Sequence, residues 1–75
     1  HMSYEVSSRI SALGFPLKFA NLVGEQLNTD FTARQMLGYL RDAQPRTVEE
    51  IADEMLGILD FRARFMHKKI LERSR

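Results

Sequence analysis

The chain has 75 residues, with 11 lysines and arginines against 10 aspartates and glutamates, and it has no cysteine. We expect one small domain over residues 3–75, because a chain of this length has only enough apolar surface for a single core. The absence of cysteine excludes disulfides and cysteine-ligated metal centres. No apolar run approaches the roughly 20 residues that span a bilayer, so we expect a soluble, cytoplasmic protein without a membrane contact. We interpret residues 1–2 as a remnant of cloning.

The whole chain favours helix, because β-branched residues are sparse and no alternation of polar and apolar residues is long enough for a strand. The apolar spacing predicts helices over residues 4–13, 16–27, 32–42 and 47–56, followed by a basic helical segment. Ser3 is expected to cap the first helix and Gly14 to end it. Thr32 and Gln35 fit a reciprocal capping box for the third, with Phe31 packing on Met36. The sequence therefore predicts an all-α fold, a small bundle of four to five short helices.

Apolar residues at spacings of three and four mark the face that each helix buries. Thr47 and Glu50 are expected to cap the helix that follows Pro45. The predicted core consists of Val6, Ile10, Leu13, Leu17, Phe19, Ala20, Leu22, Val23, Leu27, Ala33, Met36, Leu37, Leu40, Val48, Ile51, Ala52, Met55 and Leu56.

The segment after residue 56 permits two interpretations. Gly57 could end one helix and Asp60 could cap another over residues 61–73, so that the last two helices meet at an angle. Alternatively, a three–four apolar spacing continues from Ala52 to Ile70, and the two would merge into one long helix. We favour the break, because a helix over residues 48–73 would be more than twice the typical length of about 11–12 residues.

Charge is polarised along this C-terminal half. Residues 48–60 hold five acids and no base, whereas residues 61–75 hold six bases and one acid. A basic helix can attract the phosphates of a nucleic acid. The alternative interpretation is that these bases interact favourably with the dipole at the C-terminal end of the helix and balance the negative charge of the acidic segment beside them.

The stretch PRTVEEIADEMLGI, which begins at Pro45, resembles the middle of helix-turn-helix domains, in particular those of winged-helix regulators. In that family an apolar helix precedes a Thr-x-Glu-Glu-Ile-Ala helix, then Leu-Gly-Ile and a basic recognition helix. The likeness covers residues 33–73, and no wing follows. The resemblance implies DNA binding in which basic side chains approach phosphates or base edges and a threonine donates to a phosphate. The residues so implied are Thr47, Arg62, Arg64, Lys68 and Lys69.

A second surface is apolar. Phe61 and Phe65 lie one helical turn apart and, with Ile58 near them, form a strip on the last helix. Such a strip either covers the earlier helices or pairs with another molecule, most simply in a two-fold homodimer. We expect an interface, because small domains often gain burial by association.

Residue types for catalysis or metal binding are scarce. His67 has no second histidine or cysteine with which to hold zinc, and no phosphate loop or nucleophile elbow occurs. We expect no enzyme activity, no metal and no cofactor. The sequence therefore predicts a helical regulatory module that binds nucleic acid through its basic last helix. The alternative is a protein–protein interaction or dimerisation module that uses the strip of Ile58, Phe61 and Phe65.

Overall fold

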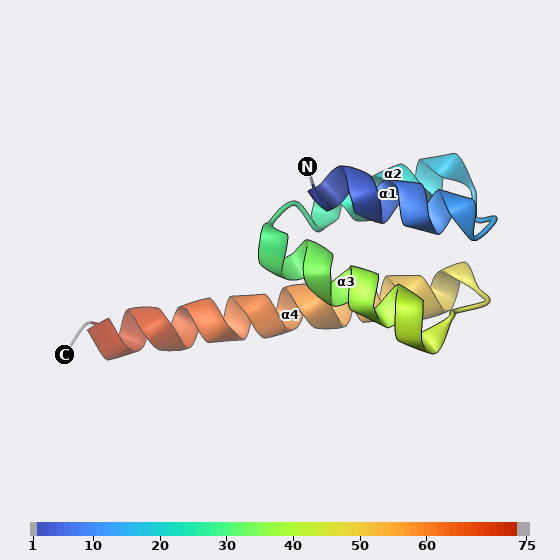
Figure 1. The fold of residues 1–75 in the computed structure, drawn as a ribbon. Coiled ribbons are helices and arrows are strands. Elements are labelled where there is room, and N and C mark those ends of the chain that lie inside the picture. The colour runs from blue at the N-terminus through green and yellow to red at the C-terminus, as the bar shows by residue number, and fades with distance from the viewer. Residues whose placement is uncertain (1, 74–75) are drawn as a thin grey trace.

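Four helices, joined by three short connections, make up the fold. The computed structural model describes the backbone of residues 2–73 and the side chains of residues 4–64. In chain order the helices are α1 (Met2–Ala12), α2 (Leu17–Gln26), α3 (Asp30–Ala43) and α4 (Val48–Arg73). Helices α1, α2 and α3 pack together, and α3 runs antiparallel to the first half of α4 (Figure 1). The predicted all-α bundle is confirmed, with its last helical segment merged into one long helix.

The turn between α1 and α2 follows from two residues of special geometry. Gly14 has a φ of 98°, the left-handed conformation that glycine adopts without strain, and its amide donates to the carbonyl of Ser11. Pro16 precedes α2 with a φ of −58°, close to the value that its ring imposes. The expected helix end at Gly14 is confirmed, but the expected cap at Ser3 is wrong, since α1 begins at Met2.

Helix α3 begins two residues earlier than the sequence pattern indicates. Thr29 is its N-cap, and its hydroxyl accepts a hydrogen bond from the amide of Thr32 at 3.2 Å. The Thr32 hydroxyl in turn accepts from the Thr29 amide at 3.2 Å. Thr32 therefore takes the part that glutamate or glutamine has in a capping box, and the predicted box of Thr32 with Gln35 is wrong.

Helix α4 begins as predicted and ends differently. The Thr47 hydroxyl accepts from the Glu50 amide at 3.2 Å, which confirms the cap. The expected break between Gly57 and Asp60 is wrong, because α4 is continuous from Val48 to Arg73. A glycine in a helix interior costs only about 1 kcal/mol. Continuing the helix keeps residues 51 and 58 on one buried face against the rest of the bundle, which offsets that cost.

The core lies where α1, α2, α3 and the first half of α4 meet. Its fully or nearly buried apolar residues are Val6, Ile10, Ala20, Val23, Leu27, Ala33, Met36, Leu40, Ile51 and Ile58. Four residues of the predicted core are exposed: Leu13 follows the end of α1, Leu17 and Leu22 lie on the outer side of α2, and Leu56 lies on the outer side of α4. The helical repeat explains Leu56, because it is five residues from Ile51 and so lies about 140° around the helix from it.

Candidate functional site

The residues predicted to bind nucleic acid are spread along α4. Thr47 lies at its start, where its hydroxyl donates to the Glu50 carboxylate at 3.1 Å and accepts from the Glu50 amide. Arg62 is exposed, fifteen residues further on, which is roughly 22 Å along a straight helix. The structure therefore does not bring Thr47 and Arg62 together. The side chains of Lys68 and Lys69 lie outside the described residues.

Arg64 has a partner within its own helix. Its guanidinium lies 3.2 Å from the carboxylate of Asp60, one turn earlier, and both side chains are exposed. An exposed pair of this kind contributes only a few tenths of a kcal/mol, so Arg64 can exchange Asp60 for another anion at little cost. The guanidinium of Arg64 can therefore pair either with Asp60 or with an anionic group of a binding partner.

The proposed recognition helix has no turn before it. A helix-turn-helix places two helices at about 90–120° across a short turn. Here residues 48–73, which would contain the second helix, the turn and the recognition helix, form one helix. The angled pair that the resemblance implies is therefore not present in this segment.

The predicted apolar strip is only partly correct. Ile58 is 6% exposed and belongs to the core, so its assignment to an interface is wrong. Phe61, one turn later, is 58% exposed. Phe65 belongs to α4, but its side chain lies outside the described residues. The boundary between buried and exposed surface on α4 therefore falls between residues 58 and 61.

Phe61 shares its surface with Phe31, which was predicted to pack on Met36. The ring of Phe31, from the first turn of α3, stacks on the ring of Phe61 with centroids 6.1 Å apart and planes at 18°. Phe31 is 45% exposed. The packing of Phe31 on Met36 stays a prediction. We call Phe31 and Phe61 together the aromatic patch. In the sequence, the aromatic patch is indicated only by the position of Phe31 next to the start of a predicted helix.

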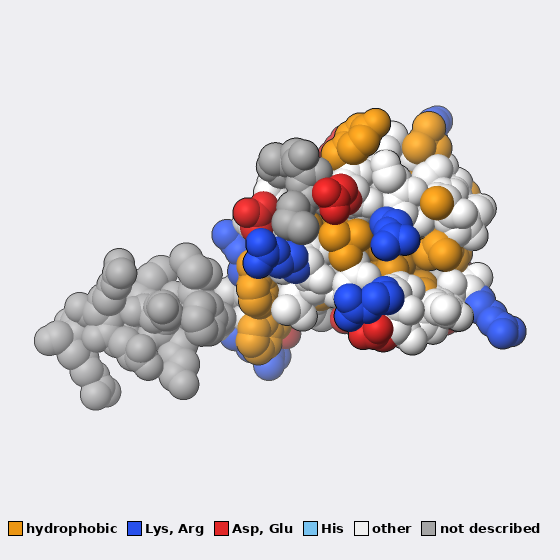
Figure 2. Space-filling model, viewed as in Figure 1, with side chains coloured by type: hydrophobic (Ala, Val, Ile, Leu, Met, Phe, Trp, Pro, Cys, Tyr) orange, Lys and Arg blue, Asp and Glu red, His pale blue; other side chains and the backbone are white. Residues whose placement is uncertain are grey.

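The aromatic patch lies where α4 leaves the bundle. Figure 1 shows α4 continuing beyond the start of α3, so that its C-terminal part has no other helix of the chain beside it. In Figure 2, hydrophobic side chains gather at this end of the described surface, with basic side chains next to them. The arrangement joins exposed aromatic area, a projecting helix and adjustable charge, which are features of a surface that binds another macromolecule.

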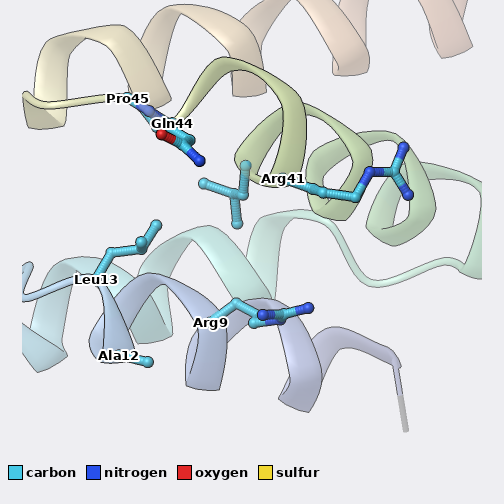
Figure 3. Close-up of a pocket in the computed structure, with 7 residues that line it drawn as sticks. Arg9, Ala12, Leu13, Arg41, Gln44 and Pro45 are labelled. Carbon is cyan, nitrogen blue, oxygen red and sulfur yellow. The ribbon is translucent and has the colours of Figure 1, made fainter.

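A depression lies elsewhere on the described surface, between α1 and the end of α3. It has a volume of about 410 Å³. Figure 3 shows Arg9 of α1 and Arg41 of α3 on its two sides, with Gln44 and Pro45 closing one end. Arg41 is bound by its neighbour Asp42 through two hydrogen bonds of 2.9 and 3.2 Å. This hydrogen bonding, with the attraction between the charges, raises the pKa of Arg41 and lowers that of Asp42.

This depression lacks the groups that a reaction needs. Its lining is Arg9, Ala12, Leu13, Leu40, Arg41, Gln44 and Pro45, which includes no general base and no nucleophile. An adjoining depression of about 340 Å³ adds Arg34 but also Glu5. The carboxylates of Glu5 and Asp42 offset much of the positive charge here. The α1–α3 groove is therefore a weaker candidate for a binding site than the surface around the aromatic patch.

Neither metal-binding groups, nor membrane-spanning helices, nor related proteins point to another functional site among the described residues. Within the described part of the chain, no three histidine, cysteine or acidic residues are grouped so as to hold a metal ion. Among the same residues, no helix combines the length and the apolar character needed to cross a bilayer. Comparison with protein-family models, with curated proteins and with solved structures found no match to this chain.

Proposed function

We propose that this protein is a non-enzymatic protein-interaction module that associates with a second copy of itself through the aromatic patch and the adjacent part of α4. The observation that carries the proposal is the size of the exposed surface. The chain exposes 5636 Å², whereas a compact monomer of 8.7 kDa exposes about 4,700 Å². The difference, roughly 900 Å², is close to the ~800 Å² that each partner buries in a standard interface.

The shape of the chain supports the same proposal. Its radius of gyration is 13.5 Å, whereas a compact domain of 75 residues has about 11 Å. The longest dimension is 48 Å against 22 and 19 Å for the other two. The chain is therefore elongated, and the aromatic patch lies where α4 leaves the bundle (Figure 1).

The composition of the aromatic patch favours a protein partner over nucleic acid. Aromatic residues and arginine are enriched at the centres of protein interfaces, and Phe61 is followed directly by Arg62. A helix that reads a DNA groove instead presents polar side chains to base edges. An aromatic ring contributes there only an apolar contact with a thymine methyl group, and α4 lacks the turn of a helix-turn-helix.

Sedimentation equilibrium of the full chain over a wide range of concentration tests the proposal. We expect a dimer at high concentration, and we expect Phe61→Glu to shift it to monomer by placing a charge at the interface. Tyr4→Glu is the matched control, because Tyr4 is an exposed aromatic residue on α1, away from the aromatic patch. Circular dichroism confirms that each variant keeps its helices. A wild-type chain that stays monomeric at every concentration contradicts the proposal.

Nucleic-acid binding is the competing outcome, and it has its own test. A fluorescent DNA duplex is titrated with the wild-type chain at low salt and again as salt rises. We expect no saturable binding. Binding that weakens linearly in a log–log plot against salt, and that Arg62→Ala with Arg64→Ala abolishes, would favour the nucleic-acid hypothesis instead.

A further inference from the structure

The charges of α4 change sign at the midpoint of the helix. Helix α4 spans Val48–Arg73, so its midpoint lies between Asp60 and Phe61. Five of its six acids fall at or before this point, namely Glu49, Glu50, Asp53, Glu54 and Asp60, and the sixth is Glu72 near the end. The first bases, Arg62 and Arg64, follow at once, and their exposed side chains begin the basic half.

We propose, on the basis of the self-association proposed above, that two copies of α4 lie side by side and antiparallel about a two-fold axis near Phe61. In this arrangement the acidic half of each helix faces the basic half of its partner. A parallel pair would place acid against acid and base against base, and juxtaposed like charges oppose association. The sequence of α4 therefore selects one of the two orientations.

The aromatic patch lies at the same place as the proposed axis. A two-fold interface is formed by one surface meeting its own copy, so residues near the axis contact their counterparts. Phe61 is next to the midpoint of α4, and Phe31 stacks on it. Pairing at this point would cover the exposed area of both rings in both copies, which gives the interface an apolar centre and a charged periphery.

The backbone leaves room for a close approach near the axis. A Cβ built on Gly57 would meet no atom within 4 Å, so the surface one turn before the midpoint is open. Beyond Phe61 no helix of the same chain covers α4 (Figure 1). A helix of 26 residues is about 39 Å long, so an antiparallel pair can overlap over its whole length.

Distances between spin labels test the orientation. The chain has no cysteine, so a single introduced cysteine carries the only label. In an antiparallel pair, labels on Asp60→Cys lie near the axis, on helices whose axes are roughly 10 Å apart. Labels on Glu49→Cys, at the far end of α4, lie roughly 35 Å apart. In a parallel pair both positions give the same short distance.

The outcomes separate this proposal from the one on which it rests. A short distance at position 60 with a long one at position 49 supports the antiparallel pair. Equal short distances at both positions overturn it and leave self-association intact. Absence of coupling at both positions, together with a monomer in sedimentation, overturns both proposals.

Charge reversal provides a second test. Arg62→Glu with Arg64→Glu makes α4 more uniformly acidic, and we expect it to lower the association constant about tenfold or more at low salt. In the antiparallel pair, residues 62 and 64 lie opposite residues 59 and 57 of the partner helix. Mixing this variant with an Asp53→Lys, Asp60→Lys chain, whose changes lie within about one turn of those positions, should therefore restore association as a heterodimer. Arg9→Glu with Arg34→Glu, on α1 and α3, is the matched control and should leave association unchanged. Equal loss in both double variants, or no recovery on mixing, overturns the proposed charge pairing.

Discussion

Phe31 and Phe61 stack with their ring centroids 6.1 Å apart and their planes at 18°, although 30 positions separate them in the chain. The contact ties the first turn of α3 to the midpoint of α4. It is the last described aromatic contact before α4 leaves the bundle. The pair therefore has two effects, since it fixes the direction of α4 and presents exposed apolar area.

Replacing Phe31 should weaken the fold measurably. Phe31→Ala removes the ring on which Phe61 packs, and stacked aromatic pairs contribute about 0.5–1.5 kcal/mol beyond the area that they bury. We expect the free energy of unfolding in urea to fall by about 1 kcal/mol. Tyr4→Ala, which removes an exposed ring from α1, should change it by less than about 0.5 kcal/mol. Equal losses in the two variants would mean that the stack adds nothing.

Two residues on α4 should respond very differently to truncation. Ile51 is fully buried, whereas Leu56 is 59% exposed on the same helix. Ile51→Ala should lower the free energy of unfolding by about 3 kcal/mol, because it removes buried methyl groups and leaves a cavity. Leu56→Ala should change it by less than about 0.5 kcal/mol. Thermal unfolding followed by circular dichroism measures both, and a large loss from Leu56→Ala would contradict the described face of α4.

Most of the fold could be predicted from local sequence patterns. The errors occur where contacts between helices, and not adjacent residues, determine the structure. Gly14 and Thr47 mark helix boundaries correctly, because turn and cap geometry depend on residues that are adjacent in sequence. Gly57 and Asp60 carry an equally good local signal for a turn. There the packing of α3 along one face of α4 stabilises a continuous helix, and no local rule contains that contribution.

The candidate site was harder to predict for the same reason. Ile58 and Phe61 are three residues apart and lie about 60° from each other around α4, so the repeat places them together. Whether each is buried depends on how α2 and α3 pack against α4, and this packing leaves Ile58 6% exposed and Phe61 58% exposed. Phe31 could not be identified as a partner of Phe61, because the contact exists only once α3 and α4 are antiparallel.

The environment of Tyr39 predicts that the free energy of unfolding decreases at alkaline pH. Its hydroxyl lies 3.4 Å from the backbone carbonyl of Glu50, to which it donates. Desolvation, with the negative charges of Glu50, Glu54 and Asp53, raises the pKa of Tyr39. A raised pKa means that the folded chain holds the proton more tightly than the unfolded chain, so the contribution is complete below about pH 10 and is lost as the pH rises through the raised value.

The measurement is the urea midpoint at a series of alkaline pH values. Wild type should lose stability more steeply above about pH 10 than Tyr39→Phe, which has no phenol to ionise at this position. A Tyr39→Phe curve with the wild-type slope would show that the phenol ionises equally easily in the folded and unfolded chains.

A pair of glycine substitutions tests the continuity of α4 directly. A Cβ at Gly57 or at Gly14 would meet no atom within 4 Å, so neither substitution creates a clash. The two residues differ in backbone conformation, since Gly14 has a φ of 98° and Gly57 lies within a continuous helix. Gly57→Ala should therefore raise the free energy of unfolding by about 0.5–1 kcal/mol. Gly14→Ala should lower it by about 1 kcal/mol, because alanine is strained at positive φ. If Gly57→Ala instead destabilises the chain as Gly14→Ala does, then residue 57 forms a turn, the two angled helices of the helix-turn-helix hypothesis return, and the antiparallel pairing of α4 loses the straight helix that it requires.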